Sequence, residues 1–160
     1  MVMSAIDLSK YIITKCAREN KPISNLQLQK ILYCIQANYY NNWYKYKIAF
    51  YEPIYAWECG PVVPKAYYRF CGYGGMPITT EYENIDIEQE DKDIIDPIVE
   101  YLRDLPPWEL SKITNGKGSA WYWYKTYNNG VNMHKDISFN IIELYDQNSK
   151  GVNKIVNSNT

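Results

Sequence analysis

The sequence is short of the side chains on which most catalytic and metal sites depend. It has one histidine, His134, and its four cysteines form no Cys-x-x-Cys pair. A Cys-His or Ser-His nucleophile would need that single histidine, and the spacing of a structural zinc site or a thioredoxin motif is missing. We therefore expect no enzyme activity, metal or cofactor, and we expect the cysteines to be buried free thiols.

Charge and long apolar runs are also limited. The chain has 17 Lys and Arg against 18 Asp and Glu, a formal net charge of -1. A nucleic-acid partner is not expected, because such proteins neutralise phosphates with an excess of basic side chains. No stretch approaches the roughly 18 consecutive apolar residues that a membrane span needs, and the N-terminus lacks a basic segment followed by an apolar run. These absences predict a cytoplasmic protein without membrane contact.

Aromatic residues, in contrast, are abundant: 17 Tyr, 5 Trp and 3 Phe in 160 residues. Tyr and Trp are enriched at protein interfaces, although filling a helical core is the alternative for any one of them. The run 39–46 contains Trp43, and Trp121 and Trp123 belong to a second run, 121–124. Successive helical residues point about a quarter-turn or more apart, so one buried face cannot hold the whole second run. Trp43, Trp121 and Trp123 are therefore candidate partner contacts.

Capping signals and apolar spacing predict a mainly α single domain of about six helices. Ser4 with Asp7, and Ser24 with Gln27, have the spacing of capping boxes. The segment 137–145 fits a helix or a strand, and the Asn- and Ser-rich end is typical of a frayed tail. We expect a domain over 1–146, a tail over 147–160, and helices over about 5–19, 25–39, 64–70, 88–104, 107–114 and 120–127, with Pro97 causing a kink or a later start.

Residues 46–58 predict a small β element of two short strands. Ile48 to Trp57 is rich in β-branched and aromatic residues, and Pro53 restricts the middle to an edge or a turn. Gly60-Pro61 is expected to end the extended stretch.

Three separated motifs in this chain resemble, in order and spacing, the Panacea domain, a family also described as SocA-like or phage-associated GepA-like. The resemblance extends over about 7–127. The motifs are Leu28-Gln29-Lys30-Ile31-Leu32-Tyr33, then Glu52 to Trp57 with Gly60-Pro61-Val62-Val63-Pro64, and then Leu110-Ser111-Lys112-Ile113-Thr114 with Trp121.

The resemblance implies a mainly helical antitoxin that neutralises a cognate toxin protein by direct binding. One member of the family instead delivers its toxin to a protease. A regulatory or adaptor protein borne by a phage or mobile element is therefore the alternative, and a homo-oligomer is possible. An enzyme with a pocket around Lys30, Trp57 and Asn115 is the third hypothesis.

The motif positions are the candidate site residues that the resemblance implies. Where the family commonly has His after the motif Thr, this chain has Asn115. Tyr33 fits a core position, and Gly60-Pro61 fits a sharp turn. Lys30 and Trp57 near that turn indicate a polar pocket or a buried hydrogen-bond network, which is our candidate functional surface. The set is Lys30, Tyr33, Trp57, Gly60, Pro61, Val62, Ser111, Thr114 and Asn115.

Overall fold

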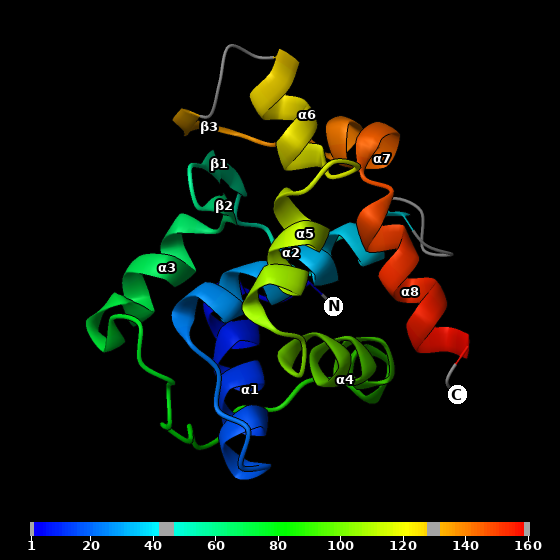
Figure 1. Cartoon of the computed structure of the whole chain (residues 1–160). Coiled ribbons are helices and arrows are strands. Elements are labelled where there is room, and N and C mark those ends of the chain that lie inside the picture. The colour runs from blue at the N-terminus through cyan, green and yellow to red at the C-terminus, as the bar shows by residue number, and fades with distance from the viewer. Residues whose placement is uncertain (1, 42–46, 128–131, 159–160) are drawn as a thin grey trace.

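The computed structural model describes residues 2–41, 47–127 and 132–158, and it is mainly helical, as the sequence predicts (Figure 1). Within these ranges there are eight α-helices, one short 3₁₀ helix and three strands. In chain order they are α1 (Ala5–Arg18), α2 (Asn25–Asn41), β1 (Tyr55–Trp57), β2 (Gly60–Val62), α3 (Pro64–Phe70), η1 (Cys71–Tyr73), α4 (Gln89–Arg103), α5 (Pro107–Asn115), α6 (Ala120–Tyr127), β3 (Asn132–Asp136), α7 (Phe139–Tyr145) and α8 (Asn148–Ser158).

Both predicted capping boxes close the first turn of a helix. The Ser4 hydroxyl accepts a hydrogen bond from the Asp7 amide at 3.0 Å at the start of α1. At α2, the Ser24 amide donates to the Gln27 side chain at 2.9 Å, and the Gln27 amide donates back to the Ser24 hydroxyl at 3.2 Å. These bonds satisfy amides that have no acceptor within the helix, so both helix starts are confirmed.

Helix α2 is the centre of the molecule (Figure 1). It packs against α1, α3, α4, α5, α7, α8 and β2, and its side chains from Leu28 to Tyr39 are all buried. A helix that is covered on all sides must find partners for every polar side chain that it carries.

Two glutamines of α2 bind the backbone of segments that pack on it. Gln36 donates to the Phe50 carbonyl and accepts from the Ala49 amide, both at 2.7 Å. Gln29 accepts from the Val63 amide, just before α3, at 2.9 Å. The polar residues of α2 thus hold neighbouring loops in place, in addition to its apolar packing.

The β element is a three-stranded antiparallel sheet of order β2-β1-β3 in the part of the chain that the structure describes. Its position corrects two expectations. Gly60-Pro61 does not end the extended stretch but lies in β2, where an edge strand tolerates the missing amide of Pro61. The predicted first extended piece before Pro53 forms only an isolated bridge between Met3 and Phe50, and β3 was not expected.

Three further expectations are settled at the other elements. The predicted frayed tail is wrong, because α8 packs against α2 and α4 with Ser149 and Val152 buried. The ambiguous segment 137–145 forms α7, which begins at a Ser138 cap. Helix α4 runs through Pro97 from Gln89, so it does not start late.

The expectation that the cysteines are buried is confirmed for two of the four. Cys16 and Cys34 are buried, but Cys59 and Cys71 are exposed, and all four are free thiols. Cys59 follows β1 in a turn and Cys71 follows the end of α3, positions that the core does not cover. Within the described ranges, no helix combines the length and apolar character needed to cross a membrane.

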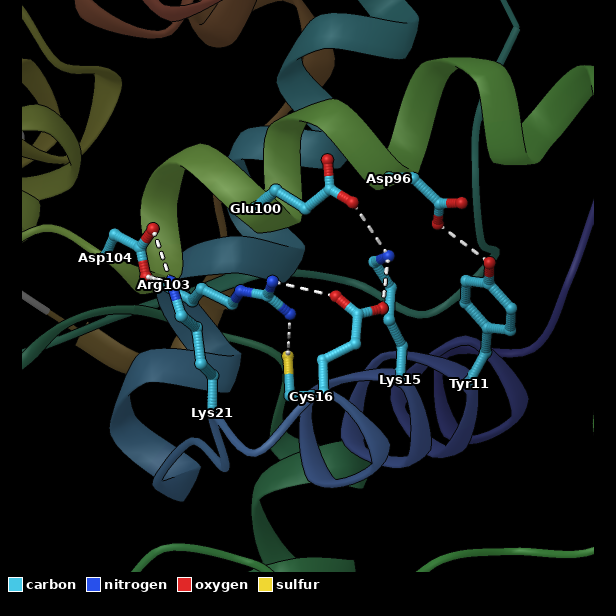
Figure 2. A network of polar contacts seen from close by, with 9 residues as sticks. Tyr11, Lys15, Cys16, Lys21, Asp96, Glu100, Arg103 and Asp104 are labelled. Atoms are coloured by element: carbon cyan, nitrogen blue, oxygen red, sulfur yellow. Dashed lines mark hydrogen bonds and ion pairs between the residues drawn. The ribbon is translucent and has the colours of Figure 1, made fainter.

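Polar contacts join α1 to α4 along one side of the molecule (Figure 2). Lys15 lies 2.8 Å from Glu19 and 3.0 Å from Glu100, and Arg103 lies 2.8 Å from Glu19. The Arg103 side chain is 7% exposed, and its guanidinium also donates to Cys16 Sγ at 3.8 Å. This network fixes α4 against α1, and it does not involve the family motifs.

Candidate functional site

Lys30 is the point at which the three sequence motifs meet. It lies on α2, only 3% exposed, and its Nζ donates to the Cys59 carbonyl in the β1–β2 turn at 3.1 Å. The same amine donates to Asn115 Oδ1 at 3.1 Å and to Thr114 Oγ1 at 3.4 Å, both at the end of α5. Residues separated by more than 80 positions thus share one buried hydrogen-bond network, as the sequence predicts for Lys30.

Position 60, in the strand that follows the Cys59 turn, requires a glycine because of its backbone conformation and because a neighbouring side chain leaves no room for a Cβ. Its φ is +120°, a region that side-chain-bearing residues rarely adopt. A Cβ added there would lie 2.3 Å from Asn115 Oδ1, far inside van der Waals contact. The Asn115 Nδ2 group also donates to the Cys59 carbonyl at 2.9 Å, which holds the turn against α5. The expected turn role of Gly60 is confirmed, and Asn115 provides the contact that makes a glycine necessary.

The Lys30 amine is surrounded by neutral oxygens. None of the ion pairs formed among residues 2–41, 47–127 and 132–158 includes it. Burial lowers the pKa of Lys30 below its ordinary value of 10.5, against a smaller opposing effect of the Cys59 and Cys34 thiols. Its three N–H donors have three oxygen acceptors, so the amine is engaged in holding the turn.

Trp57 connects this network to the surface. Its carbonyl accepts from the Trp121 indole N–H at 2.7 Å, which joins β1 to α6. Its ring packs against Tyr67 and Tyr68 of α3, at centroid distances of 5.2 and 5.8 Å. The Trp57 indole Nε1 is itself buried without an acceptor among the described residues. The motif tryptophan therefore belongs to a cluster of three rings beside the turn.

Tyr33 forms a second buried network one turn further along α2. Its hydroxyl donates to Asp146, which also accepts from the Ser149 amide at 2.9 Å and the Ala120 amide at 3.3 Å. Burial raises the pKa of both Tyr33 and Asp146. Tyr33 is fully buried, which confirms its expected core position, and it links α2 to the starts of α6 and α8.

The remaining motif residues line the same region. Pro61 and Val62 are buried in β2, and Thr114 is buried at the end of α5. Ser111 is half-buried on α5, one turn before Asn115. The structure thus brings the Lys30, Gly60 and Thr114 motifs together, while Tyr33 lies in the adjacent network.

The three candidate partner contacts have different positions. Trp43 lies outside the described residues. Trp121 is 6% exposed, whereas Trp123 is half-buried between two rings: it stacks on Tyr145 at 4.4 Å and 12° and contacts Tyr127 at 5.6 Å. Tyr127 and Tyr145 are 72% and 39% exposed. The expectation that one helix face cannot bury the whole run 121–124 is confirmed, since Tyr122 is also exposed.

Sequence reasoning missed the parts of the site that come from the backbone and from distant segments. The Cys59 carbonyl, the central acceptor, has no side-chain signature, and Asp146 lies beyond the third motif. Tyr67 and Tyr68 could have been found, because the helix 64–70 was predicted beside the Gly-Pro turn.

The described residues offer few groups for catalysis. They contain no cluster of three or more His, Cys, Asp or Glu side chains that could hold a metal ion. His134, the single histidine of the sequence, lies in β3. Glu52 accepts from the Ala5 amide at 2.8 Å and so completes the N-terminal turn of α1.

A comparison with models of protein families found a match. The model of the family described as "Antitoxin SocA-like, Panacea domain" matches residues 28–122, more than half of the chain, and this range contains all three motifs. No curated protein and no solved structure matched the chain.

Proposed function

Since the chain belongs to the family of SocA-like antitoxins with the Panacea domain, we propose that it neutralises a cognate toxin protein by binding it directly and has no catalytic activity. The observation that carries this proposal is that the polar side chains of the motifs already have hydrogen-bond partners inside the fold. The donors of Lys30 and the side chain of Asn115 bind the Cys59–Gly60 turn and each other. Polar groups that are already hydrogen-bonded within the protein are not free to act on a substrate. Such a site is better suited to holding a binding surface in position than to catalysis.

The surfaces that these networks position are aromatic. Trp57, Tyr67 and Tyr68 form one cluster beside the turn, and Trp123, Tyr127 and Tyr145 form a second across α6 and α7. Protein interfaces concentrate their binding energy in such residues. The abundance of Tyr and Trp in the sequence is thereby connected to particular faces of the fold.

The test is coexpression of the protein with the product of the adjacent gene, followed by measurement of growth and affinity purification. We expect growth to be restored and the toxin to copurify. The toxin level, followed by immunoblot, distinguishes direct neutralisation from delivery to a protease: it stays constant in the first case and falls in the second. Restored growth without copurification and with a modified toxin would contradict the proposal and indicate an enzyme.

A further inference from the structure

Helix α3 carries its exposed side chains in one stripe. Lys65, Tyr68 and Arg69 are exposed, with Tyr68 at 60%, whereas Ala66 and Phe70 are buried against the core. Positions i, i+3 and i+4 lie on the same side of a helix, so the two cations and the tyrosine ring share one exposed face. The helix lies at an edge of the molecule, next to β1 and β2 (Figure 1).

The two cations of this stripe have no carboxylate partner among the described residues. Neither Lys65 nor Arg69 forms an ion pair within the ranges that the structure describes, and Glu58, the exposed carboxylate of the adjoining turn, pairs with neither. Six other basic residues do have such partners: Lys15, Arg18, Lys21, Lys92, Arg103 and Lys112. The outer face of α3 is therefore locally basic in a chain whose net charge is -1.

The motif site is directly behind this face. The Trp57 ring lies 5.8 Å from the Tyr68 ring, and Tyr67 packs on both. The Asn25 side chain of α2 donates to the Tyr67 carbonyl at 3.0 Å, and the Lys30 network fixes the turn that follows Trp57. Rings held in this way lose little conformational freedom when they are covered by a partner.

We propose that this face, consisting of Lys65, Tyr68, Arg69 and the half-buried Trp57 ring, binds an acidic segment of the toxin. The inference rests on the proposed function, and it names the surface and the chemistry of the partner. Carboxylates of the toxin pair with Lys65 and Arg69, and an apolar side chain between them covers Tyr68 and Trp57. Two cations are too few for a nucleic-acid site, which typically neutralises about 6–10 phosphates.

The experiment measures binding of the purified toxin from the adjacent gene by calorimetry at about 50 and about 300 mM salt. The test variant is Lys65→Glu with Arg69→Glu. The control is Lys117→Glu with Lys154→Glu, which makes the same change of charge at exposed cations that also have no ion pair in the described chain. All four side chains are exposed, so the variants are expected to fold.

We expect the α3 variant to bind at least about tenfold more weakly at low salt and the control to bind like the original protein, because reversed charges repel a partner's carboxylates. Tyr68→Ala should weaken binding at both salt concentrations. If the original protein binds and the α3 variant equals the control, the α3 inference is wrong while the proposed function stands. If the original protein does not bind the toxin, both fail. Binding of a single-stranded oligonucleotide with similar affinity, lost in the α3 variant, would also overturn the inference and assign the face to nucleic acid.

Discussion

Gly60 shows how one residue combines a backbone and a packing requirement. We predict that Gly60→Ala lowers the free energy of unfolding by about 1–3 kcal/mol, because alanine must adopt an unfavourable φ and displace the Asn115 side chain. Urea denaturation measures the change. Gly72→Ala is the control, since an added Cβ there meets no atom within 4 Å, and it should change stability by less than about 0.5 kcal/mol. Equal effects at the two glycines would show that the geometry at Gly60 imposes no constraint.

The burial of Lys30 predicts that the stability of the protein depends on pH. Its pKa is lowered in the folded protein, so the unfolded state binds more protons and the stability that Lys30 contributes rises with pH toward 10.5. The difference in free energy of unfolding between the original protein and Lys30→Met should therefore increase as the pH rises toward 10.5, the ordinary lysine pKa.

Lys15→Met provides the matched control for this pH series. Burial lowers the pKa of Lys15, but hydrogen bonds to Glu19 and Glu100 outweigh it and leave the pKa raised. Its contribution should stay constant over the same range and decline only above the ordinary lysine pKa of 10.5. A difference for Lys30→Met that does not change with pH would mean that the amine is not desolvated.

At the scale of elements, the contacts between α1 and α4 give a further prediction (Figure 2). Arg103→Met should lower the free energy of unfolding by about 1–3 kcal/mol, because it removes the more deeply buried of the two cations that pair with Glu19 and leaves Lys15 as its remaining partner. Arg18→Met should cost about 0.5 kcal/mol or less, since its ion pair with Glu81 is 60% and 54% exposed. Thermal and urea denaturation would measure both. Similar losses for the two variants would show that burial does not strengthen the Arg103 contact.

The elements also show which parts of the fold local sequence signals determine. The capping boxes at Ser4 and Ser24, and the proline at the start of α3 and of α5, predict helix starts that are observed. The small β element was predicted, but β3 and α8 were not, for a different reason: β3 pairs with β1 from more than 70 positions away, and α8 has few apolar residues. Both elements form because of contacts with segments that are distant in the sequence, and local secondary-structure propensity does not reflect such contacts.

The candidate site was predictable to a similar degree. Lys30 and Trp57 were expected near a buried network at the Gly-Pro turn, and the structure places them there. The identity of the Lys30 acceptors could not be predicted, because one is a backbone carbonyl and the others lie at the end of α5. The residues that carry the proposed contact, Lys65, Tyr68 and Arg69, stand out only when burial shows that they share an exposed face.

At the scale of the whole molecule, the central claim is that the protein neutralises its toxin by staying bound to it in a stoichiometric complex. The motif polar groups are engaged inside the fold, and two aromatic clusters remain at the surface. A protein that works in this way must be present in amounts comparable to its toxin, whereas an enzyme or a protease adaptor acts repeatedly on many toxin molecules.

The most direct test is the ratio of this protein to toxin at which growth recovers. The two proteins are expressed from separately controlled promoters and quantified by immunoblot, and the complex is sized by size-exclusion chromatography with light scattering. The account predicts that growth recovers when the two proteins reach the stoichiometry of the isolated complex. Full recovery when toxin exceeds this protein by about tenfold, with no complex detected, would contradict it.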